Sequence, residues 1–126
     1  MTQPTIMVVD DDPDILELVT AILRDEGYEV TAVSNGDIAL VILEQGLPYR
    51  VLITDVVLPG ALDGFALARK ARELNPGINV IYATGFAEVA RVRSRGAPFG
   101  EILQKPWRAS DLVQMVSSAA RCSISA

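Results

Sequence analysis

Short apolar runs alternate with segments of helical periodicity along the whole chain, and this alternation constrains the fold more than any other feature. Five runs have the composition of β-strands: residues 5–9, 28–33, 51–54, 79–83 and 101–104. Five segments between or after them place apolar residues at helical spacing: 13–26, 35–45, 65–74, 87–94 and 110–121. Helices that separate successive strands predict right-handed crossovers and a parallel sheet covered by helices on both faces.

Local signals mark where these elements begin and end. Pro13 stands at a first helical position and Gly27 closes the same helix, while Asp63 is expected to cap the helix over 65–74. The runs 6–9 and 51–53 are almost continuously apolar, which is typical of central parallel strands buried on both faces. A chain of 126 residues is expected to form a single domain over 1–126, with a core of about 5–120.

Composition excludes several classes of function. The sequence contains no histidine, so it holds neither a Ser-His-Asp couple nor a phosphohistidine of its own. A net charge of −5 disfavours nucleic acid as a partner, because phosphates repel an acidic surface. The single cysteine, Cys122, permits no internal disulfide, and no apolar stretch approaches the length of a membrane span. We therefore expect a cytoplasmic protein that binds neither nucleic acid nor membrane.

Polar residues follow four of the predicted strands. Asp10, Asp11 and Asp12 follow the first strand, Asp55 the third, Thr84 the fourth and Lys105 the fifth. The carboxyl ends of parallel strands lie at one edge of the sheet, where open α/β proteins bind ligands. Clustered carboxylates repel one another, and Mg²⁺ is the hard cation that suits an all-oxygen site of this kind. A nucleophilic carboxylate, a metal, a lysine and a hydroxyl are the parts that aspartyl phosphate chemistry needs.

Each of these signals also has a simpler interpretation. The acidic run 10–14 also suits a helix N-terminus, and Asp55 alone could be a turn residue. Thr84-Gly85 alone could be an ordinary exit from a strand, and Lys105-Pro106 alone is a weak signal of function. The coincidence of all four at successive strand ends is what favours a functional site.

The sequence resembles the receiver domain of two-component response regulators from about residue 5 to 120. The matching segments are 7–12, 52–59, 63–64, 83–85 and 105–106. The resemblance implies a flavodoxin-like, doubly wound (βα)5 fold with strand order 2-1-3-4-5. It also implies a signalling switch without an output domain in this chain. Such a switch is not an enzyme, although it catalyses its own phosphorylation.

The same resemblance assigns roles to individual residues. Asp55 is the implied phosphoacceptor, with Thr84 and Lys105 in contact with the phosphoryl group. Asp10, Asp11, Asp55 and the backbone carbonyl of Val57 are the implied ligands of Mg²⁺, for which Mn²⁺ can substitute. The implied donor is a phosphohistidine on a histidine kinase or a histidine phosphotransfer protein. Lys105 is expected to matter more to phosphoryl stabilisation than to folding.

Three departures from the common receiver pattern shape the expectations further. The loop from Asp55 to Asp63 is one residue longer than usual, and residues 82–86 resemble a subgroup with the motif Phe-Ala-Thr-Gly-Tyr. Ile102 replaces the aromatic residue that often switches rotamer.

Val57 and Phe86 flank the expected path of the hydrolytic water, and neither side chain can orient a water. Autodephosphorylation is therefore expected to be slow.

Other functions remain open at this level. Asp10-x-Asp12 after an apolar strand also resembles the nucleophile motif of haloacid-dehalogenase-type phosphatases, and a pseudo-receiver would keep the fold as a binding module. A downstream protein is expected at the face formed by helix 4, strand 5 and helix 5, where Ile102 and Trp107 are candidate contacts. Trp107 equally suits simple packing of the last loop. A relay intermediate, a competitor for a kinase, an effector and the receiver part of a hybrid kinase all fit the sequence, although Met1 favours a natural short protein.

Overall fold

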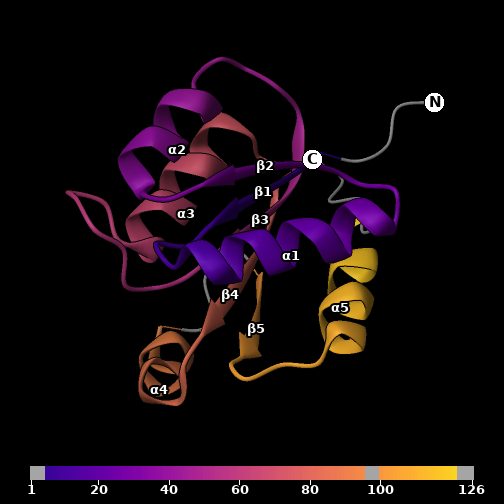
Figure 1. The fold of residues 1–126 in the computed structure, drawn as a ribbon. Helices are drawn as coiled ribbons and strands as arrows, with labels where there is room; N and C mark the ends of the chain where they lie inside the picture. Colours follow the sequence, from indigo (N-terminus) through magenta and orange to yellow (C-terminus); the bar gives the residue numbers. More distant parts are fainter. Residues whose placement is uncertain (1–4, 96–99, 122–126) are drawn as a thin grey trace.

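The computed structural model describes residues 5–95 and 100–121, in which five strands and five helices alternate (Figure 1). In chain order the elements are β1 (Thr5–Val9), α1 (Pro13–Asp25), β2 (Glu29–Val33), α2 (Gly36–Leu43), β3 (Tyr49–Thr54), α3 (Gly64–Leu74), β4 (Asn79–Thr84), α4 (Phe86–Ser94), β5 (Gly100–Gln104) and α5 (Ala109–Arg121).

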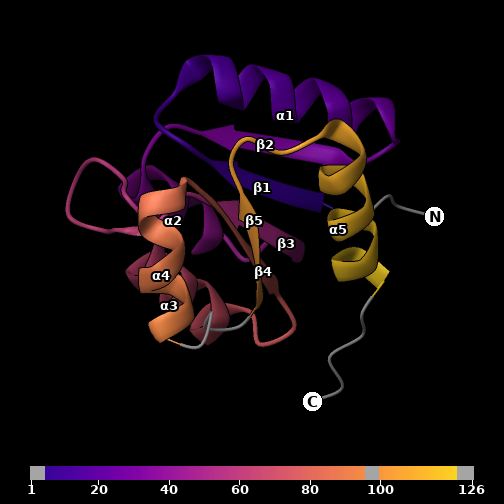
Figure 2. The ribbon, with the colours of Figure 1, turned by 90° about the horizontal axis from the view of Figure 1, so that it is seen from below.

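The strands form one parallel sheet in the order β2-β1-β3-β4-β5. Helices α1 and α5 cover one face of the sheet, and α2, α3 and α4 lie on the other (Figure 2). This flavodoxin-like arrangement confirms the fold and the strand order predicted from the sequence. None of the described helices is long and apolar enough to cross a membrane.

Alternation along the strands divides the core into two layers. Ile6 and Val8 of β1 face α1 and α5, whereas Met7 and Val9 face the opposite helices. All four side chains are at most 2% exposed, as expected for a central strand covered on both faces.

Hydrogen bonds explain where the element boundaries differ from the sequence prediction. Strand β2 begins at Glu29, because the Tyr28 N–H still bonds to the Leu23 carbonyl at the end of α1 (3.1 Å). Strand β3 begins two residues earlier than predicted, at Tyr49, which is buried and shares a hydrogen bond with Thr31 on β2 (2.9 Å). Asn35 is the N-cap of α2, where its side chain accepts from the Ile38 N–H.

Strand β4 extends one residue further than predicted, to Thr84, which pairs with Gln104 of β5. The sequence also predicts a turn over 97–100, where proline and glycine occur close together. This turn lies outside the described residues except for Gly100, the first residue of β5.

Candidate functional site

Inter-strand backbone hydrogen bonds continue past the ends of the strands and hold the backbone of the residues that follow. The Asp10 N–H donates to Val33, the Asp55 N–H to Val9 and the Lys105 N–H to Thr84, at 3.1, 3.1 and 2.8 Å. Each of these residues is therefore held as an extension of its strand. Their side chains meet at the carboxyl edge of the sheet, as the sequence pattern predicted.

Lys105 bridges two carboxylates that come from different strands. Its Nζ donates to Asp10 Oδ2 at 2.8 Å and to Asp55 Oδ2 at 3.1 Å. Burial lowers the pKa of the ammonium, but the hydrogen bonds and negative charges of Asp10 and Asp55 outweigh it. The pKa of Lys105 is thus raised above its ordinary value of 10.5. The ammonium is therefore charged at neutral pH, and its charge is lost as the pH rises through this raised pKa.

The remaining oxygens of the two bridged carboxylates have separate partners. Asp10 Oδ1 accepts from the Asp12 N–H at 3.0 Å. Asp55 Oδ1 accepts from the Val56 N–H at 2.7 Å and from Thr84 Oγ1 at 3.0 Å. The Asp10 side chain is 4% exposed and that of Asp55 17%, so Asp55 is the more accessible of the pair.

Asp10, Asp11 and Asp55 each place a carboxylate oxygen within 4.8 Å of the others. Three carboxylates balanced by one ammonium leave an excess of two negative charges, which suits a divalent cation. Asp11 is exposed, so the group opens to solvent, and Mg²⁺ commonly retains waters in such sites. The donor set therefore fits Mg²⁺. Val57 follows in the next turn with its side chain 55% exposed, and the ligand role of its carbonyl stays a prediction.

Asp12 does not join this cluster. Its Oδ1 accepts from the Asp14 and Ile15 N–H groups at 2.9 and 3.4 Å, which caps α1. The three consecutive acids thus have different surroundings: an ion pair for Asp10, solvent for Asp11 and a helix N-terminus for Asp12.

Gly64 lets α3 approach the residues after β3 closely. A Cβ at this position would overlap the Asp55 carbonyl oxygen, and the Gly64 N–H donates to the Val56 carbonyl at 2.8 Å. The sequence marked Asp63-Gly64 only as a loop and cap. The steric need for glycine and the Val56 N–H that holds Asp55 are backbone features, which side-chain patterns do not display.

A second cluster attaches α4 to the sheet near the site. The Phe65 and Tyr82 rings lie 5.5 Å apart, and the Arg95 guanidinium lies 4.2 Å from the centre of the Phe65 ring. Burial, reinforced by the negative charge of Asp63, raises the pKa of Tyr82 to about 12 despite the nearby Arg69 and Arg95. Tyr82 is therefore neutral throughout the physiological range.

The candidate partner contacts occupy different sides of the sheet. Ile102 packs against the core layer beneath α2–α4, whereas Trp107 packs against the layer beneath α1 and α5. Both side chains are partly buried. The side chain of Phe86, the second residue expected beside the water path, lies outside the described part of the structure.

Comparisons with known proteins identify the family. Residues 6–117 match the response regulator receiver domain model. A response regulator receiver protein of Brucella abortus, CpdR, is 37% identical over 112 residues, which are 88% of this chain and 92% of CpdR. The chain therefore belongs to the response regulator receiver domain family.

Solved structures agree with this assignment. A response regulator receiver protein from Sinorhizobium medicae has a TM-score of 0.88 and 33% identity, with 95% of this chain and 96% of that chain covered. The receiver domain of the hybrid histidine kinase CckA has a TM-score of 0.78 and 28% identity, with coverage of 93% and 99%. The class is that of two-component receiver domains, which work with histidine kinases and phosphotransfer proteins.

The Lys105 bridge changes what we expect of this residue in folding. Lys105→Ala leaves Asp10 buried without its cation and should lower the free energy of unfolding by about 1–3 kcal/mol in metal-free buffer. This replaces the expectation that Lys105 matters little to stability. Urea unfolding measures the loss, and millimolar Mg²⁺ should restore part of it by supplying positive charge.

Lys70→Ala is the matched control, because Lys70 is exposed on α3 and is the only other lysine in the sequence. It should change the free energy of unfolding by less than about 0.5 kcal/mol. Equal unfolding midpoints for the two variants in metal-free buffer would contradict a structural role for the bridge.

Proposed function

We propose that this receiver takes a phosphoryl group onto Asp55 from a phosphohistidine of a sensor kinase or a histidine phosphotransfer protein. The observation that carries the proposal is the difference between the two carboxylates that share Lys105. Both carboxylates accept hydrogen bonds within the protein, but the Asp10 side chain is only 4% exposed, whereas that of Asp55, at the end of a central strand, is 17% exposed. Asp55 is thus the carboxylate that a donor can reach.

The proposed reaction is a single displacement at phosphorus. A carboxylate oxygen of Asp55 forms a bond to phosphorus as the bond from phosphorus to the donor imidazole nitrogen breaks. The imidazole leaves with the electron pair and takes up a proton as required, while an acyl phosphate remains on Asp55. The chain catalyses this step on itself by orienting the acceptor and neutralising charge, and the phosphoryl group stays on the chain.

Thr84 and Lys105 are the proposed donors to the phosphoryl oxygens, because both already donate to the acceptor carboxylate. Thr84 Oγ1 is 3.0 Å from one Asp55 oxygen, and Lys105 Nζ is 3.1 Å from the other. Small rearrangements transfer these two donors from the carboxylate to the phosphoryl group. The positive charge of Lys105 then offsets the charge that the reaction brings into the site.

Asp10, Asp11 and Asp55, with the Val57 carbonyl, are the residues that we propose to hold Mg²⁺, or Mn²⁺ in its place. The metal supplies charge neutralisation at the phosphoryl oxygens. Binding is expected to be weak, on the order of millimolar, because few protein ligands replace the waters of the ion.

The donor is proposed to be another protein, because this sequence has no histidine to phosphorylate. Kinases of this class draw on ATP, so the proposed compartment is the cytoplasm.

The proposed output is a change in the binding of a partner at the α4–β5–α5 side. Lys105 directly follows β5, and only one residue separates Thr84 from α4, so a change at the site can reach this side. With Ile102 in place of an aromatic residue, the change does not depend on an aromatic rotamer.

The two rival functions are less well supported. A phosphatase that used Asp10 as nucleophile and Asp12 as acid would need Asp12 beside Asp10, yet Asp12 caps α1. A pure binding module has no need for a lysine held between two carboxylates and a buried threonine aimed at one of them.

The acceptor is tested directly with acetyl phosphate as a small phosphodonor. Intact mass spectrometry should show one base-labile phosphoryl group in the presence of Mg²⁺ and almost none without it, because the metal offsets the phosphoryl charge. Asp55→Asn should abolish the modification. Asp25→Asn, which removes an exposed acid at the end of α1, should leave it unchanged. Modification of Asp10 in the unaltered protein would instead support the phosphatase.

The lifetime of the phosphorylated state is a separate prediction. Val57 presents an exposed apolar side chain two residues after the acceptor, where a polar group would orient the attacking water. Phospho-Asp55 should therefore decay over hours, and Val57→Asn should shorten its half-life several-fold. Loss of the phosphoryl mass with time after removal of the donor gives both values.

Val41→Asn is the control for that substitution. Val41 lies on α2 and is 57% exposed, against 55% for Val57, so the two changes are alike in chemistry and exposure. It should leave the half-life unchanged. A half-life of seconds in Mg²⁺ without a phosphatase would rule out the predicted slow hydrolysis.

A further inference from the structure

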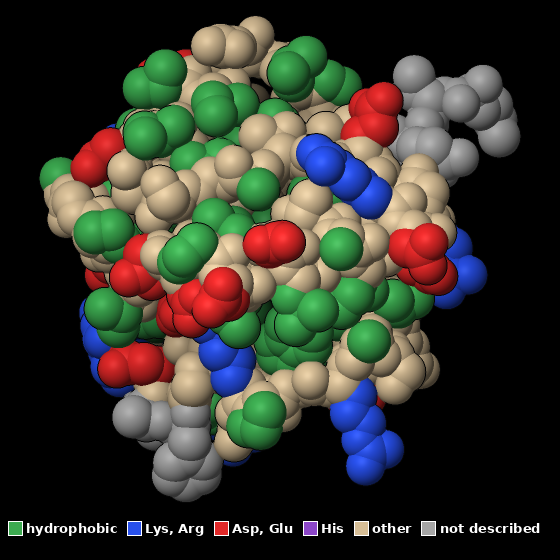
Figure 3. Space-filling model, in the orientation of Figure 1, with side chains coloured by type: hydrophobic (Ala, Val, Ile, Leu, Met, Phe, Trp, Pro, Cys, Tyr) green, Lys and Arg blue, Asp and Glu red, His purple; other side chains and the backbone are tan. Residues whose placement is uncertain are grey.

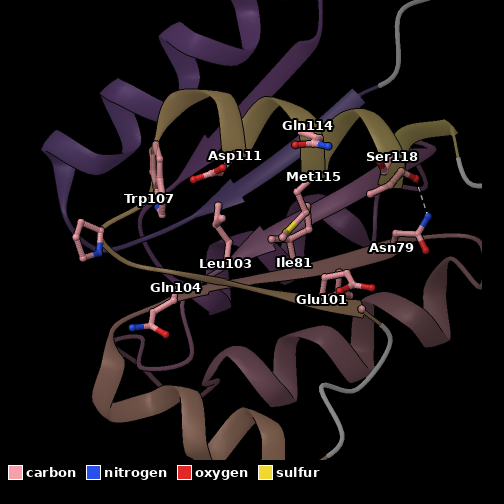
Figure 4. A pocket seen from close by; sticks show the side chains of 14 residues that line it. Asn79, Ile81, Glu101, Leu103, Gln104, Trp107, Asp111, Gln114, Met115 and Ser118 are labelled. Carbon is pink, nitrogen blue, oxygen red and sulfur yellow. Dashed lines mark hydrogen bonds between the residues drawn. The ribbon is translucent and has the colours of Figure 1, made fainter.

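A groove of about 690 Å³ lies between α5 and the last two strands of the sheet (Figure 4). Helix α5 packs over β3 and β4, and its stripe Leu112, Val116 and Ala120 is buried in the core. The adjacent stripe of α5 overhangs β5, which is the edge strand of the sheet. We call this space the β5–α5 groove; its volume is in the range of protein binding pockets.

The apolar part of the groove comes from both walls. Leu103 and Ile81 rise from the strands, Met115 descends from α5, and Trp107 stands at the end near the start of α5 (Figure 4). Trp107 and Met115 are only partly buried. A methionine and an indole at the mouth of a groove offer adaptable contact area to a large apolar side chain.

The charged part of the groove is acidic. Glu101 lies on β5, on the same side of the strand as Leu103, and Asp111 lies on the first turn of α5. The described residues of the lining include no lysine or arginine. Among the described residues Glu101 has no ion-pair partner. Within the same part of the chain, Asp111 accepts one long hydrogen bond, 3.3 Å, from the Arg108 N–H. Both carboxylates can therefore receive a cation from a bound molecule.

We propose that the β5–α5 groove docks a short segment of a partner protein in which a large apolar side chain stands next to an arginine. The apolar side chain packs on Met115, which is partly buried, above Leu103, which is 5% exposed. The arginine reaches the carboxylates of Glu101 and Asp111 and can stack on the Trp107 ring, which favours it over lysine. Docking itself does not use the phosphorylation site, but its place in signalling rests on the proposed function, since Lys105 lies between Gln104 and Pro106 of the lining.

Trp107 makes the test specific, because it is the only tryptophan in the chain. The probes are two capped hexapeptides, one alternating leucine with arginine and one alternating leucine with glutamate. The arginine peptide should shift Trp107 fluorescence in a saturable manner at micromolar to millimolar concentrations, and the glutamate peptide should not. No shift with the arginine peptide, or equal shifts with both, would overturn the proposal.

Charge-matched variants separate the groove from general attraction to an acidic chain. Glu101→Gln should lower the affinity for the arginine peptide about 3- to 5-fold, as expected for the loss of one partly exposed ion pair. Glu29→Gln removes the same charge from the edge strand at the other end of the sheet and should have no effect. Equal affinities for these two variants would show that binding is not at the groove.

A steric pair completes the test. Ser118→Phe fills the groove from α5 and should lower the affinity for the arginine peptide at least tenfold. Ser110→Phe places the same ring on α5 outside the lining and should leave the affinity unchanged. Circular dichroism checks that both variants fold. Docking should also survive Asp55→Asn. If the protein binds the peptide but cannot be phosphorylated, only the proposed function is contradicted. If it is phosphorylated but does not bind the peptide, only the docking proposal is contradicted.

Discussion

The ammonium group of Lys105 joins the carboxyl ends of three strands, and the geometry of the site depends on this one group. Asp10 follows β1, Asp55 follows β3 and Lys105 follows β5, yet a single nitrogen lies 2.8 Å from one carboxylate and 3.1 Å from the other. Without it, two carboxylates would face each other at low exposure. The bridge therefore makes an acidic pocket compatible with a folded protein before any metal or phosphoryl group arrives.

The same region shows how a dense group of acids is distributed. Within the run 10–12, one carboxylate binds the lysine, one faces solvent and one caps a helix. Asp63 likewise caps α3 through the Ala66 N–H (2.8 Å). Asp12 and Asp63 thus serve helix N-termini and do not join the site. Figure 3 shows acidic side chains spread over one face of the molecule among apolar patches.

The alternation of strands and helices predicted a parallel sheet, and the positions of Asp10, Asp55, Thr84 and Lys105 after successive strands predicted their convergence. The strand order itself came from the resemblance to receiver domains, and the cap at Asp63 from its residue type at the start of a helix. Sequence reasoning did not predict the hydrogen bonds by which Lys105 bridges Asp10 and Asp55, since a bridge between the ends of β1, β3 and β5 depends on side-chain geometry. It also missed the β5–α5 groove, which arises because α5 sits over β3 and β4 rather than over β5. Tertiary offsets of this kind leave no local pattern in the sequence.

In the resting protein Lys105 is charged and held between Asp10 and Asp55. NMR titration of protein labelled selectively at lysine can test this, because Lys70 and Lys105 are the only lysines in the sequence and give two signals. Lys105 should titrate above the ordinary pKa of 10.5, and Asp55→Asn should lower its pKa. A Lys105 pKa at or below 10.5, unchanged by Asp55→Asn, would contradict this arrangement.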